Sequence, residues 1–295
     1  MKKIRWIMII WIIGVLLMYG YYDLWKEHQK VIQGKEEEIM LPIQEERSLT
    51  KQINDYLTQQ NIPLDQISIY VKDLCGEEEV QWRTQTYMIA ASIYKLPLAM
   101  LYYDELAKGT FQINDTISYE AYCYEAGGPI ADQIEPGSLL TIETLLHDMI
   151  LYSDNTAGHI LFEHMGGWIA FKQACVKYSN MEYEDVFFSG DNVLNTQYVM
   201  DTLCYLYEHR DRYEMLLTDM KQALPNDYLN RNLPSKTAQK YGYYENALHS
   251  AGIVEAPHPY AIVIFTQLGL DARAYLGDLN KICYDYFQKT TITAS

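Results

Sequence analysis

The spacing of apolar residues predicts a helical middle flanked by strands. Ile142, Leu145, Leu146, Met149 and Ile150 recur at the helical period and predict a helix over 141–152. Residues 67–71 alternate and, with 80–82, are typical of a hairpin; 247–254 and 259–267 are also strand-like. Further helices are expected near 53–62, 93–107, 155–164, 167–178, 195–208, 211–223 and 272–288. We therefore predict an α+β fold in which N- and C-terminal segments form one antiparallel sheet flanked by helices, beside an all-helical lobe.

The first residues follow a different pattern. MKKIR precedes a run without charge from Trp6 to Tyr22, which is near the short limit for spanning a bilayer. The basic flank predicts a signal-anchor over 1–25 with the N-terminus in the cytoplasm, a mixed-charge stalk over 26–47 and an extracytoplasmic domain over 48–295. A single-pass protein at the cell membrane would result. Two alternatives stay open: a cleaved signal peptide, and a surface helix in place of the stalk.

Composition narrows the possible functions. The formal charge of −16 argues against a nucleic-acid partner, which needs a basic face. Five cysteines, at 75, 123, 175, 204 and 283, include no CxxC pair and are interpreted as small buried residues. The sequence contains neither HExxH nor a glycine-rich phosphate loop, so we predict no metal and no cofactor. The sequence does not indicate an oligomeric state.

Ser92 and Lys95 are the first candidates for chemistry. They stand three residues apart at the start of an apolar helix, and this spacing places both side chains on one helix face. A lysine that is partly desolvated loses its proton more easily and can then take the proton of a neighbouring hydroxyl. The pair is therefore a candidate nucleophile and general base.

Two other polar clusters follow predicted elements. Ser153, Asp154 and Asn155 come directly after the helix over 141–152, although Asp and Asn also begin helices commonly. Lys236, Thr237 and Ala238 precede the C-terminal strands, where an edge strand would leave backbone N–H groups free; a surface lysine on a turn is the alternative.

These three clusters, in this order, resemble the motifs SxxK, SDN and KTG of class A β-lactamases and penicillin-binding proteins. The segments Leu145–Tyr152, Asn155–Ala157, Gly166–Gly167 and Ser250–Val254 are also similar to that family. The resemblance covers about residues 48–288. It implies a β-lactamase/transpeptidase-like fold and a serine hydrolase that cleaves C–N amide bonds.

The resemblance also implies roles for individual residues. Ser92 would be acylated, Lys95 would accept its proton and Ser153 would pass a proton to the leaving nitrogen. Asn155 would hold the substrate's side-chain amide, and Lys236 and Thr237, with Ala238 beside them, would bind its carboxylate. The oxyanion hole would consist of the backbone N–H groups of Ser92 and Gln239.

Two departures from the family pattern bear on activity. Ala238 stands where the third motif has glycine, and its methyl group would crowd a substrate on the strand. Class A β-lactamases activate the hydrolytic water with a glutamate in an ExxLN pattern, whereas this chain has Asp191 in DxxLN. In one alignment Asp191 takes the place of that glutamate as the base, with a shorter side chain. In the register that we favour, Asn195 begins the next helix, the loop is shortened and the glutamate is absent.

The expected function is a membrane-tethered β-lactamase-type hydrolase that forms an acyl-enzyme on Ser92 with small-molecule β-lactams or D-Ala-D-Ala-like amides. One alternative is a D,D-carboxypeptidase or peptidoglycan amidohydrolase that acts on a stem peptide and turns β-lactams over slowly. A second is a degenerate module that binds the cell wall or acts as a sensor.

Overall fold

The computed structural model describes residues 21–31, 48–233 and 237–293. Residues 21–31 are helical and belong to a first unit, Met1–Gln52, which is described separately from the second, Ile53–Ser295. Within the described ranges, no helix has the length and apolarity that a membrane span requires. Most of the predicted signal-anchor and stalk lies outside the described residues.

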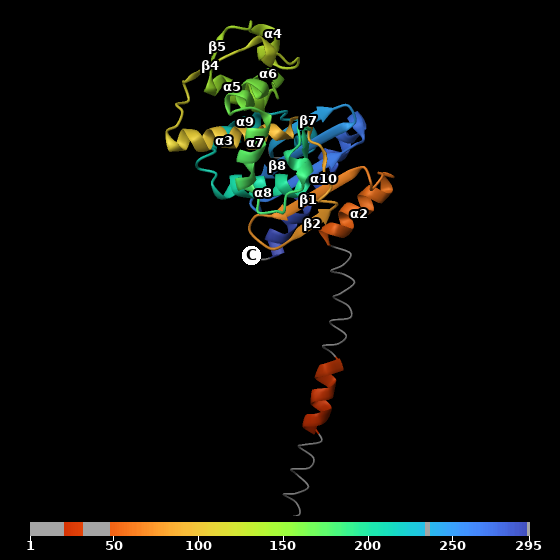
Figure 1. Ribbon diagram of the computed structural model, residues 1–295. Helices are drawn as coiled ribbons and strands as arrows, with labels where there is room; N and C mark the ends of the chain where they lie inside the picture. Colours follow the sequence, from red (N-terminus) through yellow and green to blue (C-terminus); the bar gives the residue numbers. More distant parts are fainter. Residues whose placement is uncertain (1–20, 32–47, 234–236, 294–295) are drawn as a thin grey trace, which may run out of the picture. The chain divides into compact units, whose positions relative to one another are not determined.

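A five-stranded antiparallel sheet forms the base of the second unit (Figure 1). Its strands stand in the order β2-β1-β9-β8-β7, so that N- and C-terminal segments share one sheet as predicted. Strands β8 and β9 are buried along their whole length, which explains their nearly continuous apolar sequences. The strands are β1 (Ile67–Asp73), β2 (Glu79–Trp82), β7 (Thr237–Tyr244), β8 (Ala247–Val254) and β9 (Tyr260–Thr266).

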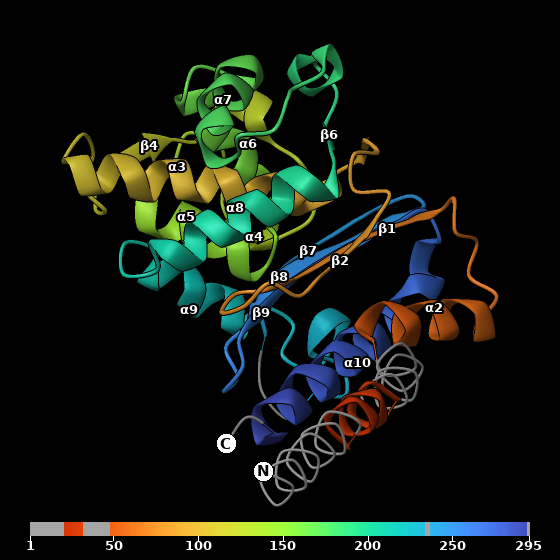
Figure 2. The same cartoon turned by 90° about the horizontal axis from the view of Figure 1, so that it is seen from below.

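Helices cover the two faces of the sheet (Figure 2). The C-terminal helix α10 (Ala272–Thr293) lies on one face, where the Tyr56 hydroxyl of α2 (Leu49–Gln59) donates to Asp278 of α10 at 2.8 Å. The helical lobe covers the other face. Its helices are α3 (Lys95–Lys108), α4 (Pro129–Gln133), α5 (Ile142–Leu151), α6 (Asn155–His164), α7 (Trp168–Ala174), α8 (Thr196–Glu208) and α9 (Glu214–Gln222).

Two pairs of short strands lie outside the five-stranded sheet. Strand β3 (Met88–Ile89) pairs with β6 (Val193–Leu194), and β4 (Thr116–Ser118) pairs with β5 (Leu139–Thr141). The 3₁₀ turns are η1 (Ala91–Tyr94), η2 (Ala121–Cys123), η3 (Cys175–Tyr178), η4 (Asp185–Phe188), η5 (Tyr228–Asn230) and η6 (Gly269–Asp271). The lobe meets the sheet through α8, α9 and η1, which pack directly against its strands.

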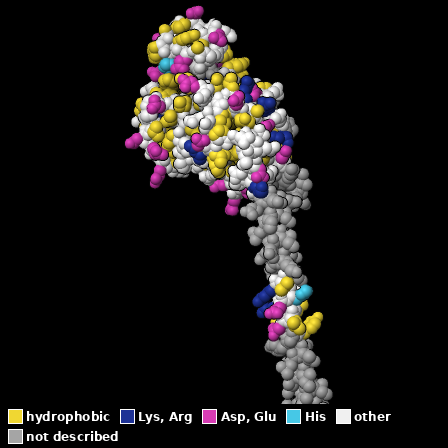
Figure 3. All heavy atoms as spheres, turned by 90° about the vertical axis from the view of Figure 1, so that its right-hand side faces the viewer, with side chains coloured by type: hydrophobic (Ala, Val, Ile, Leu, Met, Phe, Trp, Pro, Cys, Tyr) yellow, Lys and Arg dark blue, Asp and Glu magenta, His cyan; other side chains and the backbone are white. Residues whose placement is uncertain are grey.

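The surface agrees with the acidic composition, since acidic side chains are spread over the face that Figure 3 shows. All five cysteines are free thiols. Cys123, Cys175 and Cys283 are buried as expected, whereas Cys75 is exposed and Cys204 is only partly buried. No disulfide therefore supports the fold, and its stability comes from packing and buried polar contacts.

Asp104 is the centre of a buried polar cluster inside the helical lobe. Its carboxylate, 4% exposed, accepts from the hydroxyls of Tyr178 and Tyr213 and pairs with Lys177 and Arg212, at distances between 2.6 and 2.9 Å. Burial alone would raise the pKa of Asp104, but these four donors lower it to about 2. The cluster fixes α3, which carries Lys95, to the η3 and α9 regions.

Asp104→Asn should lower the free energy of unfolding by about 2–3 kcal/mol, because it removes the charge that four donors surround. A carboxylate with a lowered folded-state pKa stabilises the fold above its unfolded pKa, and the benefit is lost as pH falls from about 4 to 2. The difference between the proteins in urea unfolding should therefore shrink over that range. Asp65→Asn, at an exposed aspartate, is the control. A difference that does not change with pH would contradict this account.

Candidate active site

Ser92 and Lys95 lie at the junction of η1 and α3, and their side chains meet as the sequence predicts. Lys95 Nζ is 3.1 Å from Ser92 Oγ. It also donates to the backbone oxygen of Ser153 at 2.7 Å and to Asn155 Oδ1 at 2.6 Å. These contacts come from two segments of the chain, the turn that carries Ser92 and the tripeptide 153–155. They hold the amine against the serine hydroxyl.

Lys95 is completely buried, and this changes its acidity. Burial lowers the pKa of Lys95 to about 7, although the negative charges of Asp154 and Glu125 partly oppose the shift. Gly158 provides part of the space, because a side chain there would collide with the Tyr94 hydroxyl and crowd the Lys95 stem. A large share of Lys95 is therefore uncharged at neutral pH, and an uncharged amine can accept a proton from Ser92.

The Ser153 turn brings a second hydroxyl to the site. Ser153 has φ +58°, an unusual conformation for a residue with a side chain, and it lies between α5 and α6. Asp154 caps α6 by accepting from the Ala157 N–H at 2.8 Å and also accepts from the Ile130 N–H at 2.7 Å. Within this tripeptide Asp154 is the helix cap, whereas Ser153 and Asn155 contact Lys95.

A different lysine from the one predicted reaches Ser153. Lys240 of β7 is completely buried, and its Nζ donates to Ser153 Oγ at 2.9 Å. Burial lowers the pKa of Lys240 well below its usual range, and repulsion from Lys95 adds to the effect. Ser153 Oγ is 3.4 Å from Lys95 Nζ as well, so one hydroxyl lies between two buried amines.

The described residues of the predicted third motif do not line this site. Lys236 lies outside the described residues. Thr237 is buried against Asn280 and Asn230, and the Gln239 side chain donates to backbone oxygens of the segment 223–227. Ala238 belongs to the hydrophobic core. The expectation that Thr237, Ala238 and Gln239 line the cleft with Ser92 is wrong, and the concern about a methyl group at Ala238 no longer applies.

Lys240, Tyr241 and Gly242 take the place of that motif. A Cβ added at Gly242 would lie 2.7 Å from the Ser92 nitrogen, so the strand approaches the serine backbone where only glycine fits. Sequence reasoning missed this triplet although it ends in glycine, as the family pattern does. Alternation along a strand makes positions 236 and 240 equivalent, and so it could not choose between the two lysines.

β7 is the edge of the described sheet, and one N–H beside Ser92 faces away from β8. The Thr237 N–H and oxygen both bond to Asn230, on the side away from β8. Backbone groups alternate along an antiparallel strand, so those of Gln239, Tyr241 and Tyr243 point to the same open side. Tyr243 follows Gly242 directly. The N–H groups of Ser92 and Tyr243, rather than Gln239, are the pair that can hold one oxygen atom.

The backbone before Ser92 is held in an unusual conformation. Ala91 has φ +47°, and Asn192 forms hydrogen bonds with the backbone of Ala90 and Ala91. Asn192 Nδ2 donates to the backbone oxygen of Ala91 at 2.7 Å, and the backbone oxygen of Asn192 accepts from the Ala90 N–H at 2.8 Å. Asn192 Oδ1 is buried without a hydrogen-bond partner in the described chain. Sequence reasoning did not find Asn192, whose role depends on the β3–β6 pairing.

His249 supports the same segment from the sheet. It is buried in β8 and accepts from the Thr266 N–H through Nδ1, which leaves Nε2–H to donate to the Ile89 oxygen at 2.7 Å. Burial lowers the pKa of His249 to about 4, so the ring is neutral at physiological pH. The segment 89–92 is thus fixed by Asn192, His249 and the close approach of Gly242.

Asp191, the candidate for a water-activating base, is exposed. In the described chain its carboxylate makes no hydrogen bond with Ser92 or Lys95. Asn195 accepts from the Tyr198 N–H and caps α8, as expected for the register in which the loop is short.

Comparisons relate the chain to known proteins. The model of the β-lactamase enzyme family matches residues 48–287. Among curated proteins, no sequence matches the chain. The structure of PBP-A is similar at 18% identity with a TM-score of 0.71 and covers 82% of this chain and 96% of its own.

Two further solved structures have the same fold. A β-lactamase from Chitinophaga pinensis is 19% identical with a TM-score of 0.69, over 80% of this chain and 98% of its own. A mutant of PBP-A is 18% identical with a TM-score of 0.70, over 82% of this chain and 96% of its own, and was solved as an acyl-enzyme complex with penicillin G. These likenesses confirm the predicted α+β architecture.

The Lys95 amine should titrate near pH 7 in the folded protein. NMR of protein labelled at the lysine ε-carbons would follow each amine, and Lys95→Arg would assign the signal. Exposed Lys108 serves as the internal control, and the contact with Glu105 raises its pKa above the ordinary value. A Lys95 titration midpoint above pH 9 would show that burial does not discharge this amine.

Proposed function

The chain belongs to the β-lactamase enzyme family, and on this premise we propose that Ser92 is acylated by β-lactams and by amides of the D-Ala-D-Ala type. Membership makes the protein a serine hydrolase of the β-lactamase type. The observation that carries the proposal is the 3.1 Å contact between Ser92 Oγ and the buried Lys95 amine, at the edge of β7. The predicted domain over 48–295 is then an acyl-transfer enzyme rather than a degenerate binding module.

Acylation follows from the positions of four groups. Neutral Lys95 takes the proton of Ser92 as Oγ attacks the amide carbonyl. The N–H groups of Ser92 and Tyr243 stabilise the resulting oxyanion. Ser153, bonded to Lys240 at 2.9 Å, is placed to pass a proton to the leaving nitrogen. Each step uses a group that the fold already holds in position.

The substrate class follows from the charges at the site. Lys240 and Lys95 are two basic groups in a buried place on an otherwise acidic protein. A carboxylate next to the scissile amide would compensate this local basic charge and favour protonated Lys240. Both β-lactams and acyl-D-Ala-D-Ala peptides carry such a carboxylate. An extended substrate would lie along the open edge of β7, with Asn155 near its side-chain amide.

We propose that the acyl-enzyme is hydrolysed slowly. In the described chain no carboxylate is hydrogen-bonded to Ser92 or Lys95, and exposed Asp191 does not supply one. Asn192 Oδ1 is buried, and an amide oxygen cannot take a proton from a water in any case. These observations favour the peptidase-like alternative, in which β-lactams acylate the enzyme and leave slowly, over fast β-lactam turnover. Attachment to a membrane through residues 1–25 remains part of the proposal.

Incubation with a penicillin should give a mass increase of one acyl group on Ser92, measured on intact protein and by peptide mapping. Ser92→Ala should show no adduct. Hydrolysis of a chromogenic cephalosporin, measured alongside, should be slow after the first equivalent. Absence of both adduct and hydrolysis in folded protein would overturn the proposed function, whereas fast multiple turnover would overturn only slow deacylation.

The same assay separates the two candidate third motifs. Lys240→Ala should slow acylation about a hundredfold, because the Ser153 hydroxyl loses its partner and the substrate carboxylate loses its counter-charge. Thr237→Val, at a buried position bonded to Asn280, is the matched control and should acylate at the wild-type rate. Equal rates in wild type and Lys240→Ala would remove Lys240 from the mechanism.

A further inference from the structure

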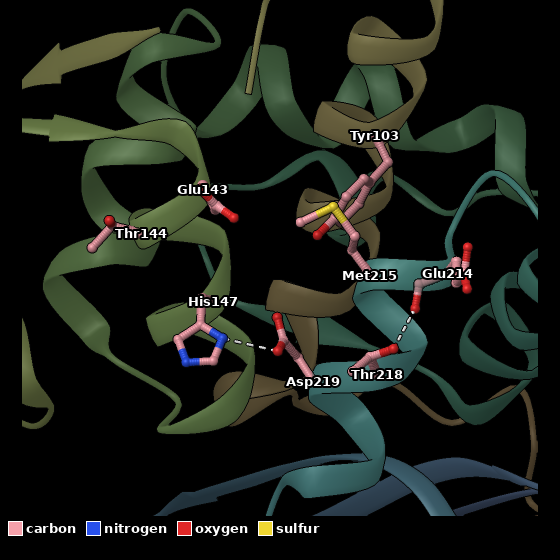
Figure 4. A pocket seen from close by; sticks show the side chains of 8 residues that line it. All are labelled: Tyr103, Glu143, Thr144, His147, Glu214, Met215, Thr218 and Asp219. Atoms are coloured by element: carbon pink, nitrogen blue, oxygen red, sulfur yellow. Dashed lines mark hydrogen bonds and ion pairs between the residues drawn. The ribbon is translucent and has the colours of Figure 1, made fainter. Parts of the chain in front are cut away.

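A hollow lies between α5 and α9 in the helical lobe (Figure 4). It has a volume of about 550 Å³, and neither Ser92 nor Lys95 lines it. Acidic and polar side chains from both helices line it, together with two apolar groups. The lining residues are Tyr103, Glu143, Thr144, His147, Glu214, Met215, Thr218 and Asp219.

Two of the acidic residues have an ordinary explanation. Glu143 and Glu214 lie in the first turns of α5 and α9, where a carboxylate stabilises the positive end of the helix. Their presence alone therefore does not indicate a ligand. Two groups in the hollow that are more buried, Tyr103 and Asp219, are not explained by helix formation.

Tyr103 is the first of these groups. Its side chain is only 6% exposed and packs edge-on against Tyr213, yet its hydroxyl makes no hydrogen bond within the described chain. Some other buried tyrosine hydroxyls have partners: Tyr102 donates to the Leu161 oxygen and Tyr178 donates to Asp104. The Tyr119 hydroxyl also lacks a partner in the described chain, but that atom is sealed from solvent. In Figure 4 the Tyr103 hydroxyl points into the hollow, beside Met215.

Asp219 is the second group. It lies in the middle of α9, and its side chain is 13% exposed. Oδ1 is 2.8 Å from His147 Nδ1, whereas Oδ2 has no partner in the described chain. Burial raises the pKa of Asp219, and the contact with His147 opposes this effect. A carboxylate oxygen and a phenol oxygen are thus both open to the same space without a donor.

We propose that this hollow binds an organic ammonium ion that carries an apolar stem. The ammonium donates to Asp219 Oδ2 and to the Tyr103 oxygen, and Glu143 adds negative charge at the entrance. Among the described residues no group of His, Cys, Asp and Glu is arranged to hold a metal ion, which favours an organic cation. A quaternary ammonium is excluded, because it has no N–H to give to these oxygens.

A neighbouring hollow can accommodate the apolar stem. An adjoining hollow of about 380 Å³ shares Tyr103 and Met215 with the first. Its other lining residues are mostly apolar: Leu106, Ala107, Phe111, Gln112, Ile113 and Arg212. Arg212 is paired with Asp104. An aryl or alkyl stem that passes Met215 would therefore reach the side chains of Leu106 and Phe111.

The test uses 4-phenylbutylamine as the probe, in calorimetric titration of the whole protein. We expect saturable binding of one equivalent. The neutral analogue 4-phenylbutanol should bind at least about tenfold more weakly, because it brings no charge to Asp219. Equal affinity for the amine and the alcohol would overturn the proposal, and so would a signal that does not saturate.

Variants locate the site. Asp219→Asn keeps the shape of the side chain and should weaken amine binding about tenfold, and Tyr103→Phe should weaken it about threefold. Glu77→Gln, at an exposed acid between β1 and β2, is the control and should bind like wild type. If a variant fails to melt like wild type, exposed Glu143→Gln replaces it. Wild-type affinity in Asp219→Asn, or equal losses in the variant and the control, would show that only the general acidity of the surface attracts the amine.

Discussion

The burial of one amine organises this molecule. A lysine in a protein interior must either keep its charge, with strong partners, or lose it. The partners of Lys95 are neutral oxygens: a backbone oxygen, an amide and a hydroxyl. The nearby carboxylate of Asp154 accepts instead from the N–H groups of Ala157 and Ile130. The same arrangement therefore supports the fold and leaves Lys95 able to accept a proton.

The site needs unusual backbone at the two hydroxyls that meet this amine. Ala91, directly before Ser92, and Ser153 both have positive φ, which costs on the order of 1–3 kcal/mol each. Such conformations persist when the surroundings determine them fully. Around Ala91 the contacts come from Asn192, from His249 of β8 and from Gly242 of β7. The lobe and the sheet thus join at the place where the chemistry is proposed.

Local patterns predict the architecture and single out the residues of the first two motifs. The period of the helix over 142–151 and the apolar strands 247–254 and 260–266 are visible in the sequence because their burial is regular. Helical spacing indicates Ser92 and Lys95, and a helix end indicates Ser153 and Asn155, but it is the order of the motifs, which resembles the family, that joins them into one site. The membrane segment remains a prediction, since most of it lies outside the described residues.

The third motif and the supports of Ser92 could not be predicted in this way. Whether Lys236 or Lys240 of the sequence reaches Ser153 depends on how the strand is aligned along β8, and alternation gives only the face. Asn192 acts through β3 and β6, two-residue strands that no periodicity reveals. Pairing between distant segments of the chain determines the position of Lys240 and the role of Asn192. Periodicity carries no information on such pairing. In the sequence only Gly242, the glycine that ends the triplet Lys240-Tyr241-Gly242, indicates the correct position of the third motif.

The pH dependence of Ser92 acylation by a penicillin is the most direct test of the central claim. With Lys95 as base, the rate should follow the uncharged amine, rise with pH through a midpoint near 7 and then level off. Stopped-flow mixing followed by intact-mass analysis from pH 5 to 9 would measure it. A rate that is independent of pH over this range, or that still rises steeply at pH 9, would contradict the account.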